Sequence, residues 1–155
     1  MSTTSNVFTS TGTSFALVAA LPATYDQAGF EALSFVDVAE VTDLGEFGAV
    51  YNKVDHSALE RRNIVKRKSM VDYGSVSVQL GRDPSDAGQA LLIAGADGVS
   101  RDDVFSISVT LQDGSVSYFT SQIYSYTTNV GAGDQIVGST VQLEIDNEII
   151  EVAAV

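Results

Sequence analysis

The sequence contains no cysteine and no tryptophan, and it has a single histidine, His56. Without cysteine, a disulfide framework, a cysteine-based zinc site and a thiol nucleophile are all excluded. A Ser-His-Asp triad would have to use His56, but the chain has no Gly-x-Ser-x-Gly elbow. With aromatic residues at only 8%, a cleft that stacks against sugars is poorly supported. We therefore expect a protein that is not an enzyme.

Two short clusters resemble ligand sites only superficially. Asp97, Asp102 and Asp103 lack the spacing and the terminal glutamate of a calcium-binding EF-hand loop. Gly131-Ala132-Gly133 is not followed by the lysine of a phosphate-binding loop, so it predicts a turn. We expect neither a metal site nor a cofactor.

Long hydrophobic runs are missing as well. The apolar run at 15–21 is far too short to span a bilayer. Residues 1–14 are dominated by serine and threonine, and they lack the positively charged start of a secretory signal. The sequence predicts a flexible N-terminal arm over residues 1–14 and no membrane contact.

Positive charge is scarce and unevenly placed. Eight Lys and Arg residues stand against twenty Asp and Glu, for a net charge of -12, and residues 1–52 contain no basic residue. Six of the eight gather in one segment: Lys53, Arg61, Arg62, Lys66, Arg67 and Lys68. This segment could contact phosphates, could be a solvated hairpin, or could meet acidic residues of a neighbouring subunit. The excess of acid elsewhere favours the last interpretation.

Alternation of apolar and polar residues predicts a β-rich domain. The expected strands are 14–21, 33–42, 75–80, 105–111, a strand that starts at 115, 137–145 and a short one at 148–152. Asp113-Gly114 predicts a type I′ hairpin turn. The apolar phase of the strand after this turn changes near Tyr118, which predicts a β-bulge there.

One helix and one long loop interrupt these strands. Asp83 is the expected N-cap and Pro84 the first helical residue, followed by small and apolar residues at helical spacing and a stop from Gly95 to Gly98. Residues from about 43 to 69 are long, polar and charged, which is typical of a functional loop. We expect a single β domain over 15–155 that carries this loop.

The order of these features resembles the major tail tube proteins of long-tailed (siphovirus) bacteriophages. The resemblance is carried by the Ser/Thr-rich arm, the apolar strand at 15–21, a turn region with Pro22 and residues 25–30, the sequence Val-Thr-Asp-Leu-Gly at 41–45, the long charged loop, Asp-Tyr-Gly at 72–74, the helix with Asp86, Gly88, Gln89 and Leu92, and the Asp-Gly hairpin at 113–114. It covers nearly the whole chain and depends on the order of the motifs.

The resemblance implies a mainly β fold, with two packed antiparallel sheets, a flanking helix, and sheets that join between subunits into a barrel around a lumen. It implies stacked hexameric rings, with the long loop reaching the adjacent ring and the arm locking neighbours. The implied partners are further copies of this chain and the tape measure, terminator and baseplate or tip proteins. DNA would pass through an acidic channel during genome delivery without specific binding, and the protein would lie in the virion tail after assembly in the host cytoplasm.

Two sets of residues follow as candidate sites. The six basic residues named above are expected to contact the next ring. The candidate lumen acids, chosen because they lie on or beside predicted strands, are Asp37, Glu40, Asp72, Glu144 and Asp146. Tubes of contractile tails and of type VI secretion share this fold, so they remain alternatives, as does a monomeric β-sandwich binding module.

Overall fold

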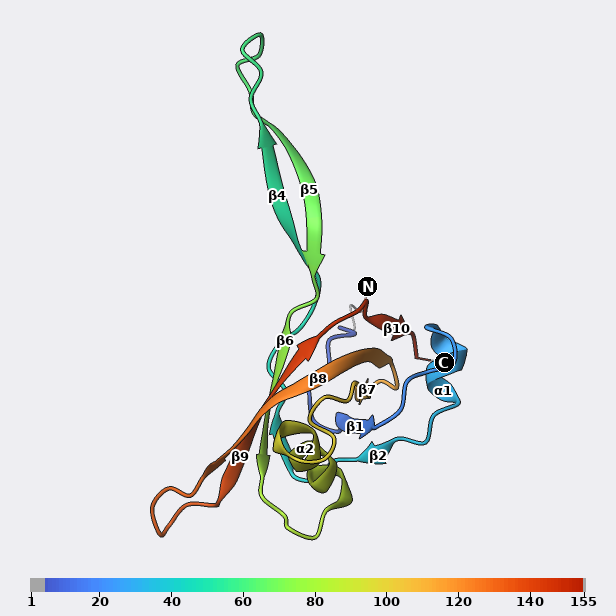
Figure 1. Cartoon of the computed structure of the whole chain (residues 1–155), viewed down its shortest axis with the longest axis vertical. Coiled ribbons are helices and arrows are strands. Elements are labelled where there is room, and N and C mark those ends of the chain that lie inside the picture. Colours follow the sequence, from blue (N-terminus) through green and yellow to red (C-terminus); the bar gives the residue numbers. More distant parts are fainter. Residues whose placement is uncertain (1–4, 155) are drawn as a thin grey trace.

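The computed structural model describes residues 5–154 as a curled eight-stranded antiparallel sheet, a projecting two-stranded ribbon and two helices (Figure 1). The strands are β1 (Ser14–Val18), β2 (Val36–Asp37), β3 (Val41–Asp43), β4 (Val50–His56), β5 (Val65–Asp72), β6 (Ser75–Gly81), β7 (Phe105–Thr110), β8 (Val116–Asn129), β9 (Gly138–Ile145) and β10 (Ile150–Val152), and the helices are α1 (Gln27–Glu31) and α2 (Ala87–Asp97). The main sheet has the order β2-β1-β7-β8-β9-β6-β3, with β10 also paired to β8. The predicted mainly β fold is confirmed.

The core lies inside the curl of the main sheet. Strands β6 and β9 alternate between buried apolar residues and more exposed polar ones, as the sequence predicted. The buried cluster consists of Phe15, Leu17, Val38, Val76, Val78, Leu80, Leu92, Phe105, Ile107, Val109, Phe119, Ile123, Val141, Leu143 and Ile145. The curled sheet forms a half-barrel, and the β4–β5 ribbon is a second, small sheet.

Helix α2 packs against this core through glycine. A Cβ on Gly95 would lie 2.6 Å from Ile123 Cδ1 and 2.8 Å from Phe105 Cε2, and a Cβ on Gly88 would lie 2.4 Å from the Asp37 carbonyl oxygen. Gly95 therefore does not end the helix, as the sequence suggested, but allows it to approach the sheet. The helix continues to Asp97 and ends at Gly98.

The single strand predicted at 33–42 is wrong. The chain forms β2 at one edge of the sheet, against β1, and then β3 at the opposite edge, against β6. Between them Glu40 has a left-handed φ of 62°, and its carbonyl oxygen accepts the Gly81 N–H at 2.8 Å. An unfavourable φ at a non-glycine residue is held by contacts made elsewhere in the fold, so no local sequence pattern predicts this crossing.

Gln89 of α2 anchors the crossing. Its side chain is 2% exposed, its Nε2 donates to the carbonyl oxygens of Ala39 at 3.1 Å and Gly81 at 2.9 Å, and its Oε1 accepts the Asp83 N–H at 2.9 Å. One buried amide thus joins the crossing, the end of β6 and the loop before α2. Buried polar groups are stabilising when they are satisfied in this way.

The N-cap of α2 is Asp86, three residues later than predicted. Asp86 is extended, and its carboxylate accepts the N–H of Gln89 at 3.0 Å and of Ala39 at 3.1 Å. Asp83 instead accepts from the backbone and hydroxyl of Ser85, closing a separate turn that holds Pro84. Two Asp residues, each able to cap, precede the helix, and sequence spacing did not distinguish them.

The bulge predicted near Tyr118 is also wrong. Tyr118 is buried because α1, which the sequence presented as a turn region, covers the outer face of β8 there, with Phe30 stacked on Tyr118 at a ring separation of 5.3 Å. Both faces of β8 are therefore apolar at this point. The register shift lies further on, between Ile123 and Ser125, against β9.

The turn between β7 and β8 differs from the type I′ prediction. Only Gly114 has a positive φ, 93°, whereas a type I′ turn needs positive φ at two residues. The Gly114 N–H donates to Leu111 O and the Leu111 N–H donates to Ser115 O. This pattern is typical of a type I turn followed by a glycine bulge.

Candidate assembly surfaces

The segment expected to be a loop at about 43–69 is a β-hairpin that projects from the body (Figure 1). Strands β4 and β5 pair only with each other, and every residue of β4 is exposed. The sequence did not reveal these strands because alternation marks a strand only where one face is buried. At about 3.3 Å per residue the seven-residue β4 extends the hairpin by roughly 23 Å.

The hairpin carries all six of the predicted contact residues. Lys53, Lys66 and Lys68 share one face, as their register shows. Lys68 Nζ lies 4.6 Å from the centre of the Tyr51 ring, and Lys53 Nζ lies 3.6 Å from Asp55 Oδ2. The structure thus gathers the basic residues on one element, while their contact with another ring stays a prediction.

The hairpin also exposes apolar side chains. These are Val50, Tyr51, Val54, Leu59, Ile64 and Met70. Leu59, at the tip, is fully exposed. An isolated two-stranded ribbon is marginally stable in water, and clustered exposed apolar groups are typical of a docking surface. The hairpin is therefore suited to pack on another molecule.

The second surface is an open edge of the main sheet. Strand β7 pairs with β8 only as far as Ser121, and β9 occupies the opposite side of β8 from there to Asn129. Within residues 5–154, no strand pairs with the free side of 122–129. The short β3 leaves much of the other border of the sheet, along β6, without ladder bonds. Open edges of this length can accept a strand from another chain.

The third surface is the polar face of β6, β9 and the second half of β8. Its rows of paired residues are Ser75, Glu144 and Gln122; Ser77, Gln142 and Ser125; and Gln79, Thr140 and Thr127. Gln142 Nε2 donates to Ser77 Oγ at 3.0 Å, so the rows are partly tied together. Glu144 is the one formal charge among these nine residues. The face is hydrophilic but nearly neutral.

The five candidate lumen acids do not lie together. Only Glu144 is on the polar face. Asp37 is on β2, Glu40 lies in the crossing before β3, and Asp72 ends β5 at the base of the hairpin. Asp146 follows β9 and accepts the hydroxyl of Thr120 at 2.6 Å. Their facing a lumen remains a prediction.

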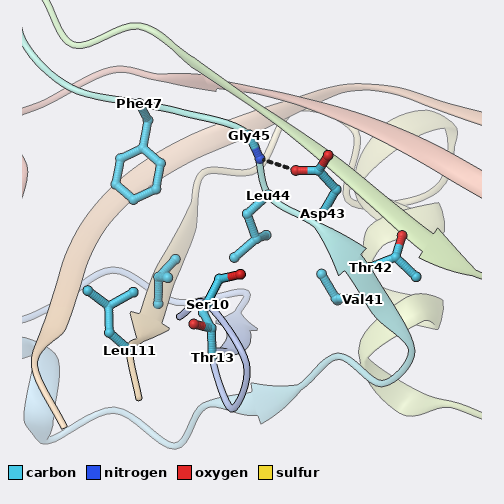
Figure 2. A pocket seen from close by; sticks show the side chains of 10 residues that line it. Ser10, Thr13, Val41, Thr42, Asp43, Leu44, Gly45, Phe47 and Leu111 are labelled. Carbon is cyan, nitrogen blue, oxygen red and sulfur yellow. Dashed lines mark hydrogen bonds between the residues drawn. The ribbon is translucent and has the colours of Figure 1, made fainter. Parts of the chain in front are cut away.

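An open cleft of about 460 Å³ lies between residues 10–13, the segment 41–47 and the end of β7 (Figure 2). Leu44, Phe47 and Leu111 give it apolar walls (Figure 2). Its one carboxylate, Asp43, accepts the Gly45 N–H at 2.7 Å. Asp43 is the one charged side chain among the described residues that line the cleft.

His56 lies at the exposed end of β4, away from this cleft. Among the described residues, no group of three or more His, Cys, Asp and Glu side chains could hold a metal ion. No helix in this part of the chain is long and apolar enough to cross a bilayer. Residues 1–4 of the predicted arm lie outside the described residues, and 5–12 are exposed without helix or strand.

The three surfaces belong to a fold that recurs in solved assemblies. No protein-family model matches the sequence, and no curated protein matches it. A chain of the anti-feeding prophage baseplate structure, solved with sixfold symmetry, superposes with a TM-score of 0.72 at 10% identity, covering 97% of this chain and 99% of its own. The protein therefore has the same fold as that baseplate chain.

Two further solved structures contain a chain with this fold. A chain from the tail of an empty GTA particle with C6 symmetry gives a TM-score of 0.61 at 12% identity, covering 80% of this chain and 90% of its own. A chain from the PVC sheath-tube complex of an extracellular contractile injection system gives 0.56 at 13% identity, covering 90% of this chain and 88% of its own. The half-barrel fold is therefore that of chains in phage-tail-like assemblies.

Proposed function

We propose that this chain is a structural subunit that polymerises into a tail tube, as hexameric rings stacked around a channel. The observation that carries the proposal is the open edge of β8 at 122–129, beside a sheet whose outer face is polar. If β8 of one subunit pairs with the β3 and β6 border of the next, the sheets join into one closed barrel. Closure pairs the open edge of β8 with the open border along β6, which is the physical reason to assemble.

The sixfold symmetry of two of the matched structures supports a ring of six. In that ring the polar face of β6, β9 and β8 lines the channel, and Glu144 supplies one carboxylate per subunit to the wall. A hydrophilic wall with few charges gives an anionic polymer such as DNA no binding site, because affinity for phosphates needs Lys and Arg. DNA therefore passes through the channel without specific binding.

The tail type has two candidates. The order of the sequence motifs favours the non-contractile tail of a long-tailed phage, with tape measure, terminator and tip proteins as partners and assembly in the host cytoplasm. The match to a chain of a sheath-tube complex favours the inner tube of a contractile tail or injection particle. Co-expression with sheath and tip proteins from the same genome separates them, since only a contractile tube recruits a sheath.

Electron microscopy of the purified chain tests the proposal itself. Hollow tubes or six-membered rings with a central hole are expected at high protein concentration. Analytical ultracentrifugation of the same sample gives the size of the species in solution. A compact monomer at all concentrations would refute the tube and favour a monomeric binding module.

A further inference from the structure

Residues 44–49, which we call the connecting segment, join β3 to β4 and continue the register of the sheet without being part of it. The last pair of β3 with β6 joins Asp43 to Gln79. The first pair of β4 with β5 joins Val50 to Asp72. Six residues separate these two pairs on either chain, so the chains are in step, as they would be in one unbroken antiparallel ladder.

The connecting segment occupies the place of a strand along β6. A Cβ on Gly45 would lie 3.8 Å from the carbonyl oxygen of Ser77. A Cβ on Gly74 would lie 3.5 Å from the carbonyl oxygen of Gly48. Both contacts join residues that the register places opposite each other. In the described part of the chain, however, no backbone hydrogen bond links the connecting segment to β6.

Strand β6 turns unpaired backbone groups toward the connecting segment. Alternate residues of an antiparallel strand bond opposite neighbours. The Gly81 N–H donates to Glu40 O at 2.8 Å, on the side of β3, so the other odd-numbered residues of β6 face that side as well. Among the described residues, the N–H and C=O groups of Ser75 and Ser77 therefore have no backbone partner. An open cleft of about 400 Å³, lined by residues of both chains, lies at this place.

Phe47 explains why the ladder stays open although the register fits. Residues directly opposite each other on antiparallel strands have their side chains on the same face. A ladder through the connecting segment would thus put Phe47 beside Ser75, on the polar face. Phe47 instead packs against the core, with its ring centre 5.4 Å from that of Phe119. Phe47 can contact the core or the segment can pair in register with β6, but both cannot occur together.

Glycine lets the segment leave the path of a strand. Gly45 has a φ of 64°, far from the negative φ of a β-strand, and glycine adopts this region at little cost. Its N–H donates to Asp43 Oδ1 at 2.7 Å, so a local bond replaces a ladder bond (Figure 2). Leu44 and Phe47 fix the segment to the core, and Gly45 is a point about which it can pivot.

We propose that the connecting segment is a gate on the sheet border that receives β8 of a second copy, an inference that rests on the tube proposed above. In the free subunit the segment covers the unpaired backbone of β6 and protects this border from non-specific pairing. During assembly Phe47 leaves the core, the segment swings out, and β8 of the neighbour takes its place along Ser75 and Ser77. The neighbour supplies ladder bonds that the segment does not, so it binds the open gate and shifts the equilibrium toward it.

Removing the Phe47 ring tests the gate. Because this ring holds the gate shut, Phe47→Ala is expected to form tubes at a protein concentration at least fivefold lower than the natural chain requires, although the Tm of the subunit falls. Phe35→Ala is the matched control. Phe35 is also half-buried and also lies near one aromatic ring, that of Tyr118 at 5.9 Å, but it precedes β2 at the opposite edge of the sheet. The control should not lower the concentration needed for tubes.

Hydrogen–deuterium exchange at residue resolution measures the movement in the natural chain, and so does not depend on the folding of any variant. The amides of Ser75 and Ser77 should exchange rapidly in the free subunit and at least 100-fold more slowly in tubes, because β8 of the neighbour then bonds them. The amides of Gly45 and Phe47 should exchange as rapidly in tubes as in the subunit, because the segment has left the border.

The outcomes are distinguishable. Phe47→Ala that needs the same or a higher concentration to form tubes overturns the gate and leaves the tube standing. Protection of Phe47 together with Ser75 in tubes also overturns it, because the segment would then have paired with β6. Slow exchange of Ser75 and Ser77 in the free subunit would show that the border is already paired. Failure of the natural chain to form rings or tubes refutes the function on which the inference rests.

Discussion

Replacing Gln89 with methionine should remove one of the main anchors of the fold. Methionine keeps the length and approximate volume of the side chain but loses its amide. Three hydrogen bonds disappear, those from Nε2 to Ala39 O and Gly81 O and that from Asp83 N–H to Oε1. At a net 0.5 to 1.5 kcal/mol each, their loss lowers the free energy of unfolding by about 2 to 4 kcal/mol.

Urea unfolding of the unassembled subunit, followed by circular dichroism, measures this change. We expect a lower midpoint at an unchanged slope, together with a fall in Tm of roughly 5 to 15 °C. Gln27→Met is the control, because Gln27 is exposed on α1 and its side chain donates to Glu31 of the same helix at 2.9 Å; it should change stability by less than about 0.5 kcal/mol. A loss below about 1 kcal/mol for Gln89→Met would refute the assignment of this amide as the anchor of the β2–β3 crossing.

Three further predictions concern the helix, acid stability and assembly. Gly88→Ala should destabilise the subunit by roughly 2 kcal/mol despite alanine's better helix propensity, because the new Cβ would lie 2.4 Å from Asp37 O. The control Ala90→Gly, on the outer side of the helix, should cost only about 1 kcal/mol. Equal stability of Gly88→Ala and the natural chain in urea would contradict the close contact at Gly88. Hydrogen bonds from Ser115 hold the pKa of Asp113 below its usual 3.8. The ionised Asp113 side chain therefore stabilises the folded subunit above pH 3.8, and this stabilisation is lost as the pH falls through the lower pKa of the folded state. The Tm of Asp113→Asn should fall less between pH 5 and about pH 2 than the Tm of the natural chain, and parallel curves of Tm against pH would contradict this prediction. Reversing Arg61, Arg62, Lys66 and Lys68 to Glu should leave a folded subunit that forms no tubes in electron micrographs, whereas normal tubes would show that hairpin charge is dispensable.

Some strands could be predicted from local sequence, whereas others depend on distant parts of the chain. Alternation located β6 and β9, which each have one buried face, and β7, where buried serines alternate with buried apolar residues; helical spacing located α2. The same signal missed β4 and β5, whose faces are both exposed, and misplaced the bulge in β8, where α1 buries the second face. Periodicity reports burial, and burial depends on what the rest of the chain places beside a strand.

The candidate surfaces divide in the same way. The clustering of Lys53, Arg61, Arg62, Lys66, Arg67 and Lys68 is a property of the sequence, so the cationic segment was predicted without coordinates. That these residues project on a hairpin, and that the five acids lie on separate elements, depends on strand order.

The sequence by itself determined the β-rich class, the position of α2 and the segregation of charge, because these follow from composition and from periods of two and 3.6 residues. Only the tertiary structure decided that the chain crosses from one sheet edge to the other at Glu40, and that β8 extends beyond the end of its partner β7. These features result from pairing between residues far apart in the chain, whose partners are chosen by the packing of the whole core.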